Sequence, residues 1–271
     1  MRAEPDDKTK LIAILGTNTI CYHVMVHSPF PLSAIEPDLL ILAYRSGIFP
    51  MSDARDDPDV FWIEPRIRAI LPLDNFHLSK SLARSLRRET FEVTCNEAFS
   101  RVIEECAQPR STDEGQSWIS HRIQESYENL HSLGHAHSIE CWQIDAKGRR
   151  TLAGGLYGVG FDRVFCGESM FAKASNASKV ALAWLVAAMQ RAGSELLDCQ
   201  FLTPHLASLG AVELSQKRYL AMLKHAQRSD SESCPALSVS QGYGALLEDA
   251  ERAGFATSPG KFIAQSLTQT S

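Results

Sequence analysis

A short Asp-Cys-Gln stretch late in the chain has a spacing that suits acid–amide chemistry. Asp198, Cys199 and Gln200 come directly after Leu196 and Leu197. Residues two apart on a strand share a face, so Asp198 and Gln200 would point the same way where a buried strand ends. An acid and an amide there can orient a nucleophile and receive its charge. Taken alone, the spacing favours the plainer interpretation of two ordinary polar residues at a strand end.

A second candidate is the stretch Gly167-Glu168-Ser169-Met170-Phe171. If it forms a strand, Glu168 and Met170 point to the same side. A carboxylate beside a pliable apolar side chain suits the wall of a cavity, where Met shapes an apolar pocket and Glu binds a cation. A glutamate facing water at a sheet edge is the competing interpretation.

A third candidate is a basic stripe on a predicted helix over residues 77–88. Lys80, Arg84, Arg87 and Arg88 fall opposite its leucines, and the segment contains no acidic residue. Uncompensated charge of one sign suits phosphate groups, whereas a solvated helix face is the alternative.

Helical and strand patterns surround these candidates in an order that predicts an α/β (α+β) fold with a mixed sheet covered by helices. Three hairpin-linked strands precede a long helix, which is also the element order of the GNAT acyltransferase core. We expect helices at 39–46, 77–88, 96–107, 120–133, 176–192 and 217–225, and strands at 137–144, 152–159, 164–171 and 195–202.

The amino-acid composition changes at several points along the chain, and these changes suggest its division into domains. We expect an N-terminal extension without a signal function, a small irregular domain rich in proline, a larger domain with the GNAT-like order of elements, and a loosely ordered tail rich in Ser, Gly and Thr. These segments would span 1–28, 29–72, 73–225 and 226–271.

Composition limits the classes of function. The 27 Lys and Arg against 32 Asp and Glu give a net charge of −5, which excludes a globally basic coat for nucleic acid but not a local basic patch. No run of 18 apolar residues exists, so we expect no membrane span. Seven widely spaced cysteines without a CxxC pair favour free thiols in the cytoplasm over a zinc site. Neither a G-x-S-x-G nor an H-E-x-x-H motif is present.

Several short motifs occur in order from about residue 29 to about 225, and as a set they closely resemble the bacterial leucyl/phenylalanyl-tRNA–protein transferases. These motifs lie at 44–50, 118–119, 136–140, 154–159, 167–171, 176–179, 198–200 and 205–211. The resemblance implies a small N-terminal domain followed by a GNAT-like C-terminal domain.

The resemblance also implies a reaction. Members of this family move Leu, Phe or sometimes Met from an aminoacyl-tRNA to the N-terminal Arg or Lys of a protein, and the product enters the bacterial N-degron pathway. The aminoacyl ester is already activated, so aminolysis needs no covalent intermediate, and we expect neither a metal nor a cofactor.

Roles for individual residues follow from the same resemblance. Gln200 would contact the attacking amine, Asp198 would orient it and help with its proton, and Glu168 would hold the basic acceptor end. The stripe of Lys80, Arg84, Arg87 and Arg88 would bind acceptor-stem phosphates. The side-chain pocket would be lined by Leu156, Phe165, Met170, Leu185 and Leu197. The terminal adenosine and ester would lie near Met51, Trp118 and Tyr127, and Tyr44 would also bind substrate.

The sequence departs from the family pattern at Met51, where family members commonly have a Trp that helps to stack the terminal adenine. A tRNA-binding homologue without transferase activity is therefore one alternative, although the intact Glu168, Asp198 and Gln200 argue against it. A second alternative is an acyl-CoA-dependent N-acyltransferase. Such enzymes need a glycine-rich pyrophosphate loop before the long helix, and residues 172–179 contain no glycine.

Overall fold

The computed structural model describes residues 19–23, 33–109, 117–228 and 237–269. Its main feature is a seven-stranded mixed sheet with the strand order β10-β4-β9-β8-β7-β6-β5. These strands span Val212–Ser215, Ile67–Ile70, Leu196–Gln200, Val164–Ala172, Arg150–Phe161, Ala136–Ile144 and Glu92–Cys95.

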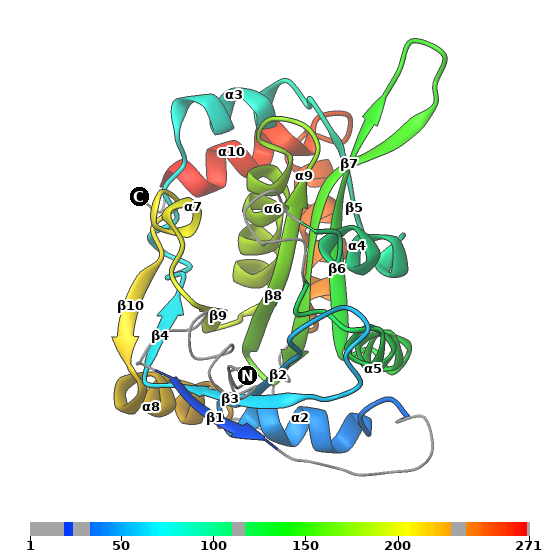
Figure 1. The fold of residues 1–271 in the computed structure, drawn as a ribbon. Helices are drawn as coiled ribbons and strands as arrows, with labels where there is room; N and C mark the ends of the chain where they lie inside the picture. The colour runs from blue at the N-terminus through cyan, green and yellow to red at the C-terminus, as the bar shows by residue number, and fades with distance from the viewer. Residues whose placement is uncertain (1–18, 24–32, 110–116, 229–236, 270–271) are drawn as a thin grey trace.

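Helices cover both faces of this sheet, which confirms the expected fold class (Figure 1). The long helix α6 packs on β6, β7 and β8, while α4 and α5 pack from the opposite side. The helices α3, α4, α5, α6, α7 and α8 span Lys80–Arg87, Phe99–Cys106, His121–Ser132, Ala177–Ala192, Pro204–Ala207 and Gln216–Ala226. Every helix and strand expected from periodicity is present with bounds shifted by a few residues, because the apolar residues of each are buried in the core.

The segment before the main sheet is more regular than its prolines suggest. It contains a three-stranded sheet of order β1-β3-β2 and a helix α2. Strand β4 also falls within 29–72, yet it pairs with β9 and β10 in the large sheet. The bounds are Thr19–His23 for β1, Pro37–Arg45 for α2, Phe49–Met51 for β2 and Phe61–Pro65 for β3. Most of the expected extension over 1–28 lies outside the described residues.

The expectation of a loosely ordered tail is wrong for residues 237–269. Two helices form there, α9 at Val239–Arg252 and α10 at Pro259–Gln269. A capping box between Ser238 and Gln241 starts α9, and its apolar residues face α6. Helix α10 lies against α3 (Figure 1). Although this segment is rich in Ser and Gly, it also has apolar residues at helical spacing. The buried ones include Val239, Leu246, Ala250, Ile263, Ala264 and Leu267.

No helix in the described ranges combines the length and apolar character that a membrane span requires.

Two glycines of α9 offer a matched test of its packing. A Cβ on Gly242 would lie 2.4 Å from the carbonyl oxygen of Ala188, whereas a Cβ on Gly244 would meet nothing within 4 Å. We expect Gly242→Ala to lower the free energy of unfolding by about 1–3 kcal/mol through overpacking. Gly244→Ala should leave it unchanged or raise it by up to about 1 kcal/mol through helix propensity. Urea unfolding of both variants measures this, and equal effects would contradict the packing of α9 on α6.

Candidate active site

The site begins where two parallel strands part. Pairing between β8 and β9 runs from Val164↔Leu196 to Cys166↔Asp198, and both strands continue beyond it. Glu168 and Gln200 lie just past this last pair, at the edge of a cavity of about 690 Å³. Most of the cavity wall is apolar, and Glu168 and Glu105 are the acidic residues in it.

A β-bulge places Glu168. In the pairing of β7 with β8, Tyr157 opposes Ser169 and Gly158 opposes Gly167, so Glu168 is the extra residue. Such a bulge re-aims a side chain and interrupts the alternation of faces. The expectation that Glu168 and Met170 point the same way is therefore wrong, although both line the cavity. Met170 packs with the core cluster around α6, and Glu168 points toward Tyr127.

Glu168 is buried and held by two neutral donors. The amide Nε2 of Gln200 donates to its Oε1 at 2.8 Å, and the hydroxyl of Tyr127 donates to its Oε2 at 3.0 Å. Burial raises the pKa of Glu168 to about 7, and the bonds from tyrosine and Gln200 oppose that rise only in part. A carboxyl group with this pKa can take and return a proton near neutral pH.

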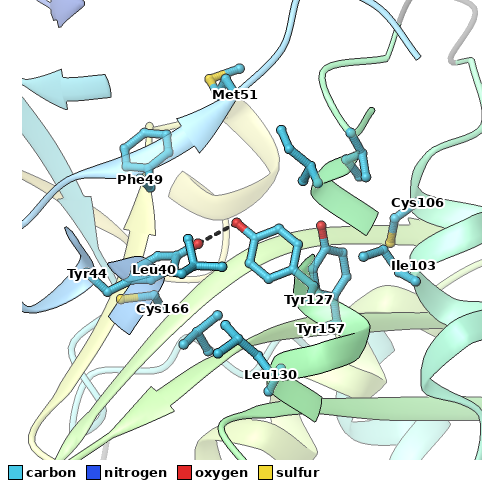
Figure 2. Packing of buried hydrophobic residues seen from close by; sticks show 14 of the residues in the cluster. Leu40, Tyr44, Phe49, Met51, Ile103, Cys106, Tyr127, Leu130, Tyr157 and Cys166 are labelled. Carbon is cyan, nitrogen blue, oxygen red and sulfur yellow. Dashed lines mark hydrogen bonds between the residues drawn. The ribbon is translucent and has the colours of Figure 1, made fainter. Parts of the chain in front are cut away.

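Tyr127 is in turn held in place by a hydrogen bond with a residue of the N-terminal segment. Its hydroxyl lies 2.5 Å from the hydroxyl of Tyr44 on α2. Figure 2 shows the two rings pointing toward one another, with Leu40 and Tyr157 packed around them. Tyr44 and Tyr127 are 1% and 0% exposed and do not line the cavity, so they support Glu168 and offer no surface for an adenosine.

Gln200 sits at the end of β9 in an unusual backbone conformation. Its φ is +62°, in the left-handed region that non-glycine residues rarely adopt. The backbone N–H of Gln200 donates to Asp198 Oδ1 at 2.8 Å. The expected shared face of Asp198 and Gln200 is confirmed, since Cys199 between them packs with the cluster around α6.

Asp198 is fully buried in an ion pair that the sequence analysis missed. Arg68 on β4 donates from Nε to Oδ1 at 2.8 Å and from Nη2 to Oδ2 at 2.5 Å. The hydroxyl of Tyr219 donates to Oδ2 at 2.9 Å. With the backbone of Gln200, four donors surround this carboxylate. This geometry suits Asp198 to holding and orienting its neighbours. It does not support the expectation that Asp198 takes part in proton transfer.

The remaining expected substrate-binding residues fall into two groups. Phe165 is 1% exposed and packs in the core behind the cavity, because its ring fills the space beside two glycines of β7: a Cβ on Gly158 would lie 2.6 Å from the ring and one on Gly160 3.6 Å from it. The cavity wall includes Met51, Trp118, Leu156, Met170, Leu185 and Leu197. Met51 and Trp118 are neighbours there, since the N–H of Ser52 donates to the carbonyl oxygen of Trp118.

Further cavity residues were not singled out from sequence. Ser178, Leu182, Cys199 and Thr203 line the wall, as does His205. The Nε2 atom of His205 is buried without a hydrogen-bond partner in the described part of the chain. Its position in the 205–211 motif was the only available signal. No group of three or more His, Cys, Asp or Glu side chains among the described residues is placed to hold a metal ion.

The basic stripe lies on the exposed face of α3, away from this cavity. Lys80, Arg84, Arg87 and Arg88 line a separate hollow together with Thr268 of α10. None of the four basic side chains forms an ion pair with a described residue. A contact at the start of α6 links the two regions. Asn176 donates from Nδ2 to the hydroxyls of Ser81 and Ser85 on α3, and Ser178 two residues later lines the cavity.

Models of two domains of one protein family match this chain. A family model for the leucyl/phenylalanyl-tRNA protein transferase matches residues 70–224, and one for the N-terminal domain of that transferase matches residues 33–66. The two matched ranges separate at β4.

Curated relatives extend the similarity over most of the chain. The leucyl/phenylalanyl-tRNA–protein transferase of Novosphingobium aromaticivorans is 58% identical over 262 residues, which cover 88% of this chain and 97% of that protein. The proteins of the same name from Rhizorhabdus wittichii and Zymomonas mobilis are 54% and 53% identical, over 71% and 72% of this chain and 75% and 70% of theirs.

A solved structure, L-PGS from Bacillus licheniformis, gives a TM-score of 0.27 at 13% identity, over 65% of this chain and 56% of that one, which is too weak to support a conclusion. The family models and the curated relatives suffice: with more than half of its length matched and a 58% identical relative, the chain belongs to the leucyl/phenylalanyl-tRNA–protein transferase family.

Proposed function

We propose that this transferase moves Leu, Phe and to a lesser extent Met from aminoacyl-tRNA to the N-terminal Arg or Lys of acceptor proteins. Transfer would take place in the cytoplasm and mark these proteins for degradation through an N-degron pathway. The observation that carries the proposal is the hydrogen-bonded pair of Glu168 and Gln200 at the mouth of an apolar cavity. Family membership supports the same reaction.

The chemistry is aminolysis of the aminoacyl ester. The amine lone pair attacks the ester carbonyl carbon, a C–N bond forms, and the C–O bond to the ribose breaks. One amine proton passes to the Glu168 carboxylate and from there to the leaving ribose oxygen. Because Gln200 donates its amide N–H to Glu168, its amide oxygen is left to accept a hydrogen bond from the incoming amine. Asp198 orients Gln200 and takes no proton, since its carboxylate already accepts four hydrogen bonds.

The apolar end of the cavity suits the transferred side chain. Its wall is built from unbranched or γ-branched side chains, which leave a deformable space for Leu, Phe or Met and disfavour β-branched Val and Ile by shape. These side chains are Leu156, Met170, Leu182, Leu185 and Leu197. Trp118 and Met51 at another part of the wall form an apolar cleft in which the terminal adenine can stack on the indole.

The charge of the cavity suits a basic acceptor. Glu105 on its wall is paired with Lys173, which leaves Glu168 as the carboxyl group of the described lining that has no ion-pair partner. An acceptor with an N-terminal Arg or Lys gains favourable electrostatic interactions there, which an N-terminal Glu lacks. An acyl-CoA-dependent acyltransferase is not favoured, because the junction between β8 and α6 contains no glycine.

The transfer reaction itself tests the function. We expect radiolabelled Leu to move from Leu-tRNA to a peptide beginning with Arg, and much more slowly to matched peptides that begin with Glu or carry an acetylated N-terminus. Gln200→Ala should lower the rate by about 100-fold while thermal stability is retained, because a misplaced amine loses most of its positioning. A wild-type protein that binds Leu-tRNA but transfers nothing would identify an inactive homologue.

The basic stripe gives a second test. Replacing Arg84, Arg87 and Arg88 by Ala should weaken tRNA binding and reduce the slope of log affinity against log salt by about 2–3, since fewer counterions are released. A matched control removes the exposed charges of Lys147, Arg149 and Arg252, of which the two arginines already pair with aspartates. Filter binding at several salt concentrations measures both. Equal slopes in the two triple variants would remove α3 from the tRNA interface.

A further inference from the structure

We propose that Arg68 is a positioning residue for the transfer reaction. It fixes the Asp198 carboxylate, and through it the backbone of Gln200 in the conformation that places the amide against Glu168. This inference rests on the proposed function of the Glu168–Gln200 pair. It assigns a role to a side chain of β4, which comes 130 residues earlier in the chain than its partner.

The surroundings of Arg68 are built to hold a guanidinium and not a general cation. The side chain is 1% exposed. Its Cζ lies 4.6 Å from the ring centre of Phe49 and 4.7 Å from that of Tyr219. A position over two rings together with two bonds to one carboxylate suits a planar guanidinium; a lysine ammonium can lie over a ring but cannot donate the paired bonds from Nε and Nη2.

The Asp198 carboxylate transmits this constraint to Gln200. Oδ1 accepts from Arg68 Nε and from the N–H of Gln200, both at 2.8 Å. A rotation of the carboxylate would break the second bond as well as the first. The left-handed φ of Gln200 is unfavourable for a residue with a Cβ, so the surrounding contacts must hold it.

Strand β4 also lies beside the catalytic backbone. Ala69, the residue after Arg68, pairs with Gln200, and Ile70 pairs with Asp198, with a register irregularity between the two pairs. The backbone of Gln200 is therefore held from β4 on one side and from the Asp198 carboxylate on the other. Loss of either should let the amide drift from Glu168 Oε1, and a drift of about 1 Å can cost about 100-fold in rate.

Arg68 further joins this arrangement to the N-terminal segment. Its Nη1 donates to the carbonyl oxygen of Gly47 at 3.3 Å, and Phe49 of β2 stacks on it. A Cβ on Gly47 would lie 2.9 Å from a side-chain carbon of Leu220 on α8, so this turn is packed closely. The N-terminal segment thereby acts on the geometry of the reacting groups.

The test compares Arg68→Lys with Arg150→Lys. Arg150 also pairs with carboxylates and stacks on a ring, that of Trp142 at 4.5 Å, but it lies outside the cavity. We expect Arg68→Lys to lower kcat about 10–100-fold and to change KM for Leu-tRNA and for the Arg peptide by less than about 3-fold. Arg150→Lys should keep the wild-type kcat. A wild-type kcat in Arg68→Lys would overturn the proposal.

A second pair of variants separates positioning from stability. Arg68→Met leaves Asp198 buried without its cation and should unfold at lower temperature, whereas Arg68→Met with Asp198→Asn removes both charges and should recover much of that loss. If Arg68 positions Gln200, the double variant stays as slow as Arg68→Lys or slower despite its recovered stability. If the rate recovers together with the melting temperature, the role of Arg68 is only structural and the proposal fails.

Amide hydrogen exchange at Gln200 gives a readout that does not need turnover. In Arg68→Lys this amide should exchange at least about 10-fold faster than in the wild type, because its bond to Asp198 Oδ1 is loosened, while amides at the β6–β7 pairing keep their rates. Unchanged exchange at Gln200 would contradict the inference. If the wild type showed no transfer activity while Arg68→Lys still exchanged faster at Gln200, the proposed function would be refuted, and only the hold of Arg68 on the Gln200 backbone would stand.

Discussion

The rest of the site depends on the buried ion pair between the Arg68 guanidinium and the Asp198 carboxylate. An isolated charge inside the protein would cost several kcal/mol, so each group requires the other, and breaking such a pair costs about 3–5 kcal/mol. The pair fills the place where β8 and β9 cease to pair. It lets the sheet open there without leaving the last polar groups of β9 unsatisfied. The opening beyond it is the cavity in which Glu168 and Gln200 stand.

The reacting groups are therefore held from two directions, and the N-terminal segment reaches both. Tyr44 of α2 contacts Tyr127 (Figure 2). Tyr127 in turn donates to Glu168. Gly47 and Phe49 contact Arg68, which holds Asp198 and Gln200. A small domain that binds substrate from outside would not need these buried contacts. Its packing instead makes it part of the support on which the catalytic pair depends.

Periodicity in the sequence was sufficient for the main helices and hairpin strands, and the two-residue spacing of Asp198 and Gln200 placed both on one face. It failed at Glu168, because a β-bulge inserts one residue and reverses the alternation, and single-strand patterns carry no trace of the partner strand. Arg68 was missed because its partner is far along the chain. Tyr44 and Tyr127 were expected to bind substrate, but a motif match cannot tell a residue that touches substrate from one that supports it.

The C-terminal segment over residues 237–269 shows a second limit of prediction from sequence. Its composition favours disorder, but burial depends on where the apolar residues fall and on the surface that receives them. Helix α9 meets a groove on α6 that accepts the bare backbone of Gly242. That groove exists only in the folded domain, so composition alone could not predict it.

The pH dependence of single-turnover Leu transfer tests the central claim most directly, namely that the Glu168 carboxylate acts in the reaction. Burial raises the pKa of this acid to about 7, so its charged form increases as the pH rises through 7. We predict that the wild-type rate rises with a midpoint near 7, apart from a further rise as the acceptor amine, with a pKa of about 7.7–8.0, loses its proton. In Glu168→Gln the transfer rate should fall and the midpoint near pH 7 should vanish. The rise in rate that follows deprotonation of the acceptor amine should remain. The same rate and the same profile in both proteins would contradict the account.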